Sequence, residues 1–426
     1  MKKVHFIGIG GIGVSSLAQY YAATGWQVSG CDAVKSEITE GLQKQDIRVH
    51  IGHDAKHIKS RDDLVVYTIA IPDSNPELQA VRSMGIRART YAEALGELTQ
   101  EYYTVAVSGS HGKSTTTALI GLVLTAARLD PTIVIGTKLR ELKGANFRLG
   151  KSKLLVLEAD EYGRSFHHYH PKIAVLTNID KEHLDIYEDY TGVLEGFRIY
   201  LSRVPEDGYI VANWADKGIR KLARDIEKRK AAQVVWYNRE KFSKHALGIP
   251  GGFNQQNAEA AWQAAKILGV KKSVAERVFK AYKGAWRRLE EIAPRVYSDY
   301  AHHPTEIKAT LGALRQKYPK QKISCIFQPH QQDRFNRLFT DFAKAFDKAG
   351  HTIILPIYSV KGRETGEART SHELVAYIRK KKVEYAENLD EVLPFLKTQQ
   401  KNGAILVFMS AGDLDAEARM RFSGSN

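Results

Sequence analysis

A glycine-rich turn in the first third of the chain has the residues needed to bind a triphosphate. Residues 109–117 have the sequence Gly-Ser-His-Gly-Lys-Ser-Thr-Thr-Thr, between the β-branched run 104–108 and the helical run 118–127. Here Lys113 can neutralise the β- and γ-phosphates of ATP, backbone amides can surround them, and the Ser114 hydroxyl can ligate Mg²⁺. Only two residues separate the two glycines, so the turn departs from the standard Walker A spacing. We expect ATP to contact Gly109, Ser110, His111, Gly112, Lys113, Ser114 and Thr115.

Two further β-branched runs end in residues that can bind a metal ion. The run 154–157 is followed by Glu158, and the run 173–177 is followed by a polar segment that contains His183. In a parallel sheet the carboxyl ends of strands lie along one edge, so we expect both side chains beside the phosphate turn. Hard cations prefer oxygen ligands and tolerate an occasional imidazole, so Ser114, Glu158 and His183 are candidate Mg²⁺ ligands.

A second glycine-rich turn lies near the N-terminus. The motif G-x-G-x-x-G occupies residues 8–13, after the apolar run 4–8 and before the helical run 14–24. Glycines permit a tight turn whose amides face phosphate oxygens, and Asp32 ends the next predicted strand, where a carboxylate can reach a ribose hydroxyl. By itself this pattern indicates a nicotinamide-dependent Rossmann oxidoreductase. The other phosphate turn and the absence of a hydride-transfer constellation argue against that alternative.

Composition narrows the class of protein further. The formal net charge is +15, from 63 Lys and Arg against 48 Asp and Glu. Such an excess favours anionic partners, but the basic residues are spread along the chain without a nucleic-acid-binding motif, so we expect no nucleic-acid function. Two cysteines cannot form a disulfide framework, and no signal peptide or membrane-spanning run is predicted, so a reducing cytoplasm is the expected compartment.

The elements that must position these residues follow an α/β pattern. Short β-branched runs alternate with amphipathic helical stretches, as in parallel βαβ units, and the length of 426 residues allows about three domains. New strand-led units begin near residues 4, 104 and 295. We therefore predict an α/β fold with three domains, at residues 1–100, 101–288 and 289–426.

Taken in order, the motifs resemble those of the Mur ligase family over essentially the whole chain. They are F-I-G-I-G-G-I-G-V-S, G-S-H-G-K-S-T-T-T, L-E-A-D-E, T-N-I-D-K-E-H-L-D-I-Y, I-P-G-G-F-N-Q-Q-N-A-E-A-A, W-R-R-L-E, S-D-Y-A-H-H-P-T-E-I, F-Q-P-H and S-A-G-D. The resemblance implies a Rossmann-like UDP-sugar-binding domain, a P-loop ATPase domain, and a Rossmann-like C-terminal domain that closes with the amino acid. It also implies that the first glycine turn binds a UDP-sugar and not a nicotinamide dinucleotide.

The resemblance implies a specific reaction. ATP would phosphorylate the lactyl carboxylate of UDP-N-acetylmuramate, and the amine of an amino acid, L-alanine in the branch with the best match, would displace the phosphate during peptidoglycan precursor synthesis. A recycling ligase that adds a whole tripeptide to the same UDP-sugar is the nearest alternative, because residues 158–162 resemble that branch too. The implied state is a monomer or a weak homodimer, without a membrane partner.

The resemblance also assigns roles to individual residues. The UDP-sugar would contact Gly10, Gly11, Gly13, Asp32 and Asn146. Beyond the phosphate turn, ATP would contact Asn254, Asn257, Arg288 and Asp299. The amino acid would contact His302, His303, His330 and Arg334. Catalysis would depend on Lys113, Glu158, His183, Arg288 and His303.

The sequence departs from the family pattern at several positions. Gln331 stands where an arginine is expected near the amino-acid carboxylate, and Asp333 follows it. Arg334 alone can still form a bidentate pair with a carboxylate. Phe253 replaces a histidine, and Gly163 replaces an aspartate. The identity of the amino acid therefore stays open at this point.

Overall fold

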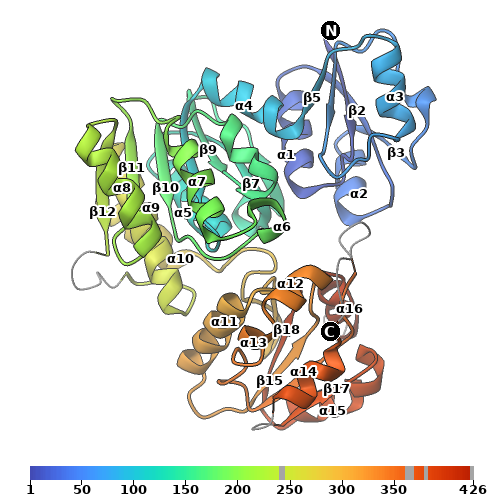
Figure 1. Cartoon of the computed structure of the whole chain (residues 1–426), viewed down its shortest axis with the longest axis vertical. Helices are drawn as coiled ribbons and strands as arrows, with labels where there is room; N and C mark the ends of the chain where they lie inside the picture. The colour runs from blue at the N-terminus through green and yellow to red at the C-terminus, as the bar shows by residue number, and fades with distance from the viewer. Residues whose placement is uncertain (239–244, 360–368, 379–381, 423–426) are drawn as a thin grey trace. The chain divides into compact units, whose positions relative to one another are not determined.

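The structure is a computed structural model that describes residues 1–238, 245–359, 369–378 and 382–422. The chain forms two compact units: Met1–His245 with Asn257–Phe279, and Ala246–Gln256 with Lys280–Asn426. Three mostly parallel sheets confirm the predicted α/β class, two in the first unit and one in the second (Figure 1). None of the helices in the described part of the chain is long and apolar enough to cross a membrane.

The first sheet has five parallel strands in the order β3-β2-β1-β4-β5. The strands are β1 (Lys3–Ile7), β2 (Gln27–Asp32), β3 (Arg48–Ile51), β4 (Leu64–Tyr67) and β5 (Ala88–Thr90). The helices are α1 (Ile12–Ala23), α2 (Glu37–Gln43), the 3₁₀ turn η1 (Ala55–His57), α3 (Pro76–Ser83) and α4 (Tyr91–Glu101). Alternating side chains pack into two separate cores, and α1 and α3 cover opposite faces of the sheet (Figure 1).

The second sheet has seven strands in the order β12-β11-β10-β6-β9-β7-β8, of which only β8 is antiparallel to its neighbour. Its strands are β6 (Tyr103–Ser108), β7 (Thr132–Leu139), β8 (Ala145–Arg148), β9 (Leu154–Glu158), β10 (Ile173–Leu176), β11 (Tyr209–Asn213) and β12 (Gln233–Tyr237). Its helices are α5 (Lys113–Ala126), η2 (Arg140–Leu142), η3 (Tyr162–His168), α6 (Leu184–Tyr187), α7 (Tyr190–Leu201), α8 (Lys217–Arg229), α9 (Gly252–Ile267) and α10 (Lys272–Ala281).

The register of this sheet puts the ends of the strands that precede the predicted ligand residues on one edge. Parallel pairing aligns Leu176 at the end of β10 with Ser108 at the end of β6. It likewise aligns Glu158 at the end of β9 with Val107. The phosphate turn and both acidic strand ends therefore leave the sheet on the same side.

Two predicted helix starts were too late. Helix α1 begins at Ile12 and not at residue 14, and α5 begins at Lys113 and not at residue 118. In both cases a glycine is the N-cap, Gly11 for α1 and Gly112 for α5. Gly112 has a left-handed φ of 82°, which glycine adopts without strain, so the chain enters the helix directly from the turn. The amides in the first turn of α5 have no acceptors within the helix. They are therefore part of the segment that we expect to bind phosphate.

The sheet of the second unit has the order β13-β14-β18-β15-β16-β17, with β13 antiparallel and the rest parallel. Its strands are β13 (Glu290–Ala293), β14 (Val296–Asp299), β15 (Ile323–Phe327), β16 (His351–Ile354), β17 (Val383–Tyr385) and β18 (Ile405–Met409). Its helices are α11 (Pro304–Lys317), α12 (Gln332–Arg337), α13 (Phe339–Phe342), α14 (Ser371–Tyr377), α15 (Leu389–Lys401) and α16 (Leu414–Phe422). A separate apolar core lies on each face.

Candidate active site

The segment after β10 fixes the shape of the phosphate turn. The Ser110 amide donates to the Asn178 carbonyl at 2.9 Å, and the His111 amide donates to the Asn178 side chain at 3.0 Å. The Thr177 hydroxyl donates to the His111 carbonyl at 2.7 Å, and the Asp180 amide donates to the Ser110 hydroxyl at 2.8 Å. The T-N-I-D motif therefore holds the turn that precedes α5, whose N-terminus favours a bound anion.

Both glycines of the turn are required by close neighbours. Gly109 and Gly112 have φ values of 138° and 82°. A Cβ atom at Gly109 would collide with Thr177, and one at Gly112 would collide with the side chain of Asn257. Asn257, predicted to lie on the adenine side, therefore packs directly against the phosphate turn within the first unit.

Lys113 is paired with a carboxylate that the sequence interpretation did not select. Its Nζ lies 2.8 and 3.0 Å from the two oxygens of Glu161 and 3.5 Å from Oδ1 of Asp160. Burial opposes the charge of Lys113, but the Glu161, Asp160 and Glu158 carboxylates outweigh it and raise its pKa. The turn therefore presents a charged ammonium. The L-E-A-D-E motif contained the signal for Glu161, which is three residues after Glu158.

Glu158 lies beside the predicted metal-binding hydroxyl. The Ser114 hydroxyl donates to its Oε1 at 3.1 Å, and the Gly136 amide donates to its Oε2 at 3.0 Å. His183 has its Nε2 3.7 Å from Glu161 and its ring edge-on to Tyr162. The structure thus places Ser114 with Glu158, and His183 with Glu161.

The donor atoms at this edge fit a hard divalent cation. Asp160, Glu161 and His183 each offer one ligand atom, and these atoms lie within 4.8 Å of one another. Together with Ser114 and Glu158 they make an oxygen-rich group with one imidazole, as Mg²⁺ prefers. The structural grouping therefore adds Asp160 and Glu161 to the predicted candidates.

Asp32 supports the N-terminal glycine turn. Its Oδ2 accepts the Gly10 amide at 2.8 Å, and a Cβ at Gly10 would lie 2.8 Å from the same oxygen. Gly13 packs against the phenol of Tyr91, and Gly11 is the N-cap of α1. The acidic residue predicted to reach a ribose hydroxyl thus also binds the turn on which a phosphate would lie.

Asn146 connects the two sheets of the first unit. Its amide nitrogen donates to the Ile12 carbonyl at 2.6 Å and to the Ser15 hydroxyl at 3.0 Å, while its oxygen accepts from Gln19 at 2.8 Å. All three partners belong to α1, and Asn146 is 5% exposed. A residue predicted to line the sugar site therefore ties β8 to the helix that follows the glycine turn.

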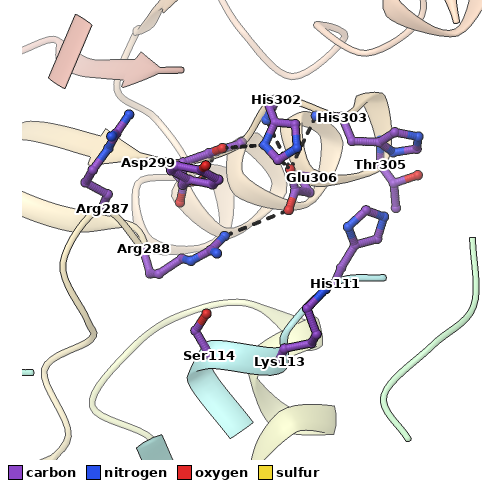
Figure 2. A network of polar contacts seen from close by, with 12 residues as sticks. His111, Lys113, Ser114, Arg287, Arg288, Asp299, His302, His303, Thr305 and Glu306 are labelled. Carbon is purple, nitrogen blue, oxygen red and sulfur yellow. Dashed lines mark hydrogen bonds and ion pairs between the residues drawn. The ribbon is translucent and has the colours of Figure 1, made fainter. Parts of the chain in front are cut away.

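In the second unit, Glu306 lies between two predicted site residues, as Figure 2 shows. Its carboxylate is 3.9 Å from Nη1 of Arg288 and 3.3 Å from Nδ1 of His302. The Arg288 guanidinium also lies over the Tyr300 ring, 4.9 Å from its centroid. Glu306 therefore lies beside both the predicted phosphate-binding arginine and a histidine, whose Nδ1 is also 2.9 Å from the Tyr300 carbonyl.

Asp299 is buried at the end of β14. Its carboxylate accepts the Leu289 amide at 2.7 Å and the Ala301 amide at 2.8 Å. Burial raises its pKa to about 6, against the opposing effect of Arg288. The predicted ribose ligand therefore changes charge near the lower end of the physiological pH range.

His303 is the N-cap of α11. Its Nδ1 accepts the Thr305 amide at 3.3 Å, and Glu306 accepts the His303 amide at 3.3 Å, which completes a capping box. Pro304 occupies the first helical position, where a missing amide costs nothing. The histidine thus has a structural role beside its predicted catalytic one.

The predicted amino-acid residues at the end of β15 are positioned by their neighbours. His330 stacks on Tyr358 with ring centroids 5.5 Å apart, and burial lowers its pKa to about 3. Arg334 donates to the His330 carbonyl at 3.4 Å. Asp333 is paired at 2.9 Å with Arg337, one turn along α12, so its charge is offset by an arginine other than Arg334.

Asn254 and Arg287 each connect segments that carry predicted site residues. The side-chain amide of Asn254 donates to the Pro250 carbonyl at 2.6 Å, near the start of α9. Arg287, which the sequence interpretation did not select, donates to the carbonyls of Ser410 and Gly412 at 2.6 and 2.9 Å. Arg287 therefore connects the W-R-R-L-E and S-A-G-D motifs.

A phosphate turn with a buried lysine and acidic strand ends, in a chain of three α/β sheets, is the arrangement of a nucleotide-dependent enzyme. Three family models match in succession: the Mur ligase family catalytic domain at residues 3–103, the Mur ligase middle domain at 107–265, and the Mur ligase glutamate ligase domain at 286–412. The chain belongs to the Mur ligase family, whose members depend on ATP.

Individual relatives are similar over nearly their full length. The UDP-N-acetylmuramate--L-alanine ligase of Alkaliphilus metalliredigens is 34% identical, over 99% of this chain and 97% of the relative. The enzyme of the same name from Acetivibrio thermocellus is 38% identical, over 97% and 94%. The solved UDP-N-acetylmuramate-alanine ligase of Thermotoga maritima matches with a TM-score of 0.80 at 25% identity, over 99% and 98%. A murein peptide ligase from Psychrobacter arcticus shares the fold, with a TM-score of 0.71 at 22% identity.

Proposed function

We propose that the protein joins L-alanine to the lactyl carboxylate of UDP-N-acetylmuramate, at the cost of ATP, in cytoplasmic peptidoglycan precursor synthesis. The main support for the proposal is the charged Lys113 in a glycine-rich turn suited to phosphate. This turn lies beside the acidic segments that follow β9 and β10. Relatives that are 34–38% identical over at least 97% of the chain carry the name of this ligase, which supports the substrates. The tripeptide ligase and the oxidoreductase are not favoured.

The reaction must first make a poor electrophile reactive. A carboxylate resists attack by an amine, and transfer of the γ-phosphoryl group of ATP onto one of its oxygens converts it into an acyl phosphate. Charge neutralisation and alignment are the main requirements of such a transfer. Lys113 and the first-turn amides of α5 meet both requirements for the phosphates. Gly10, Gly11, Gly13, Asp32 and Asn146 are the proposed sugar-nucleotide residues.

Mg²⁺ is the cation that we propose for the oxygen-rich edge of the second sheet. Ser114 and Glu158 would hold one ion, and His183 with Asp160 and Glu161 would hold another. When bound, Mg²⁺ neutralises phosphate charge and orients the triphosphate. Glu161 also holds the ammonium of Lys113 in place.

The second unit contributes the residues that we propose for the rest of ATP and for the amino acid. Asp299 would accept a ribose hydroxyl, and Arg288, held by Glu306, would contact phosphate. Arg334 would pair with the alanine carboxylate. His330 is neutral at pH 7 because its pKa lies near 3, so it can contact the amine without repelling a cation.

Phosphate release tests this proposal directly. The protein is mixed with ATP and UDP-N-acetylmuramate and with one of the twenty amino acids, or with the L-alanyl-γ-D-glutamyl-meso-diaminopimelate tripeptide. We expect release and amide formation with L-alanine above all others. Lys113→Ala should abolish both, whereas the surface variant Lys228→Ala should behave as the wild type. Preference for the tripeptide, or near-normal ligation by Lys113→Ala, would reject the proposal.

A further inference from the structure

A second group of metal-binding side chains lies in the first sheet, on the face covered by α3. The side chains of His5 on β1 and Cys31 on β2 share this face, and Glu77 reaches it from the first turn of α3. One ligand atom from each of these three residues lies within 4.8 Å of the other two, and all three residues are buried. Asp32 is next to Cys31 on the strand and consequently faces the other side, toward Gly10.

His53 completes a set of four donors. Its Nδ1 lies 3.3 Å from the Cys31 sulfur and 3.2 Å from Oε2 of Glu77. Zn–N and Zn–O bonds of about 2.0–2.2 Å and a Zn–S bond of about 2.3 Å place tetrahedral neighbours about 3.3–3.6 Å apart. The separations from His53 therefore fit a four-coordinate ion, whereas Cys31 Sγ and Glu77 Oε2, which lie 2.5 Å apart, would separate by about 1 Å on binding.

His5 provides independent support for a ligand at this place. It is 1% exposed, and its Nε2 has no hydrogen-bond partner among the described residues. Its other nitrogen, Nδ1, lies 3.0 Å from the Ser29 hydroxyl. A metal-binding histidine has this arrangement, because one ring nitrogen bonds to a neighbour and thereby directs the other at the ion. An unpaired imidazole nitrogen in a dry core otherwise costs free energy without compensation.

A further layer supports the carboxylate. Nδ1 of His57 lies 2.5 Å from Oε1 of Glu77, which also accepts the Asp54 amide at 3.4 Å, whereas Cys31 and His53 lie beside Oε2. His50 stacks on His57 with ring centroids 4.2 Å apart. Metal-binding carboxylates usually have such outer partners. His53 is 19% exposed in its side chain, so the group of donors meets solvent at this residue.

We propose that His5, Cys31, His53 and Glu77 form a structural Zn²⁺ site, separate from the phosphate and sugar-nucleotide residues. One sulfur, two imidazoles and one carboxylate suit a borderline-soft cation in closed tetrahedral coordination. Without metal, the Cys31 thiol donates to Glu77 at 2.5 Å. On binding, its S–H bond breaks, the sulfur–metal bond forms, and one proton leaves to solvent.

The site would stabilise the nearby glycine turn. The Cys31 carbonyl accepts the amides of Gly8 and Ile9, both at 2.9 Å. An ion that fixes Cys31 therefore fixes the end of β2 to which the start of this turn is hydrogen-bonded. Zn²⁺ should consequently raise the thermal unfolding midpoint without being needed for turnover.

Cobalt binding to the full-length protein is the test, because a thiolate–Co²⁺ bond gives a charge-transfer band in the near ultraviolet. Chelator-treated wild type should bind one Co²⁺ per chain with this band and release one proton, and Zn²⁺ should displace the Co²⁺. Cys31→Ala should lose the band and bind Co²⁺ at least about 100-fold more weakly. This loss exceeds the usual effect of changing a residue that contacts a metal ligand but not the metal. Cys325→Ala, which removes the other buried cysteine, should retain both properties. His57→Gln should retain the band with affinity about 10- to 100-fold lower.

Wild type without the band, or Cys31→Ala with it, would overturn the proposal. Circular dichroism checks that each variant is folded. Should Cys31→Ala fail to fold, X-ray absorption of the wild-type zinc complex decides without any variant. One sulfur among nitrogen and oxygen neighbours supports the site, and nitrogen and oxygen alone reject it.

Discussion

The ammonium of Lys113 lies 2.8 and 3.0 Å from the two carboxylate oxygens of Glu161, which is 1% exposed. A buried ion pair of this kind contributes little when both partners are present, because desolvation offsets the attraction. Its loss is costly when one partner is removed, because the other charge stays buried without compensation. The pair therefore makes Glu161 a determinant of both the stability of the phosphate turn and the position of its lysine.

We predict that Glu161→Ala destabilises the protein by on the order of 3 kcal/mol, because the buried ammonium of Lys113 loses its main partner and keeps only the longer contact of 3.5 Å to Asp160. The double variant Lys113→Ala with Glu161→Ala should be less destabilised than the sum of the two single changes, because it buries no unpaired charge. Urea unfolding followed by tryptophan fluorescence measures the cycle. Glu195→Ala, on the exposed face of α7, is the control. Additive losses in the cycle would show that the pair is not coupled.

Some of this architecture was predictable from local patterns. Alternating apolar runs predicted the α/β class, and the strand ends at Ser108 and Glu158 do share one edge. The helix starts at Ile12 and Lys113 were missed because glycines were assigned to the turns, although a glycine can also be an N-cap. The domain boundaries and the individual site roles stay predictions.

Other features could not be predicted because they depend on tertiary contacts. The acidic run 158–161 does not reveal which carboxylate meets Lys113, since that depends on the path of the chain after β9. The zinc candidates His5, Cys31 and Glu77 are far apart in the sequence and match no metal-binding spacing. Only the pairing of β1 with β2 and the packing of α3 bring them together.

Asp299 should give ATP use a pH dependence. Its folded-state pKa of about 6 is raised by burial, so its carboxylate becomes protonated, and a weaker acceptor for a ribose hydroxyl, as pH falls through 6. We expect kcat/KM for ATP, which reports groups of the free enzyme, to fall about tenfold per pH unit below that value. Asp299→Asn should have a low kcat/KM without this step. A wild-type profile that is flat from pH 7 to 5 would contradict the role.

The raised pKa of Asp299 also affects stability, but here low pH is favourable, whereas ATP use is favoured by high pH. Asp299 binds a proton more tightly in the folded than in the unfolded state, so its contribution is greatest below the unfolded pKa and is lost as pH rises through about 6. The free energy of unfolding of the wild type, relative to Asp299→Asn, should therefore decrease between pH 4 and pH 7. Denaturant titrations at both pH values measure this. An increase over that interval would contradict the raised pKa.

Asn146 should link stability to sugar-nucleotide binding. Asn146→Ala removes three hydrogen bonds to α1 and leaves the buried Gln19 amide without this acceptor, at a cost of about 1–3 kcal/mol. Because α1 follows the glycine turn, KM for UDP-N-acetylmuramate should rise while KM for ATP changes little. Asn388→Ala, which removes the cap of α15, is the control, since it should lower stability alone. An unchanged sugar-nucleotide KM in Asn146→Ala would limit the residue to a structural role.

The replacement at Gln331 leaves Arg334 as the arginine expected at the amino-acid carboxylate. Charge-assisted hydrogen bonds contribute about 1.5–3 kcal/mol, so Arg334→Gln should raise KM for L-alanine by roughly 10- to 100-fold and leave KM for ATP unchanged. Arg421→Gln, which breaks an exposed pair with Asp390, is the matched control in the same unit.

Gln331→Arg should lower KM for L-alanine, because Asp333 is already paired with Arg337 and does not compete for the added charge. Steady-state kinetics with L-alanine, glycine and L-serine separates affinity from specificity. Equal KM values for L-alanine in wild type and Arg334→Gln would place its carboxylate elsewhere.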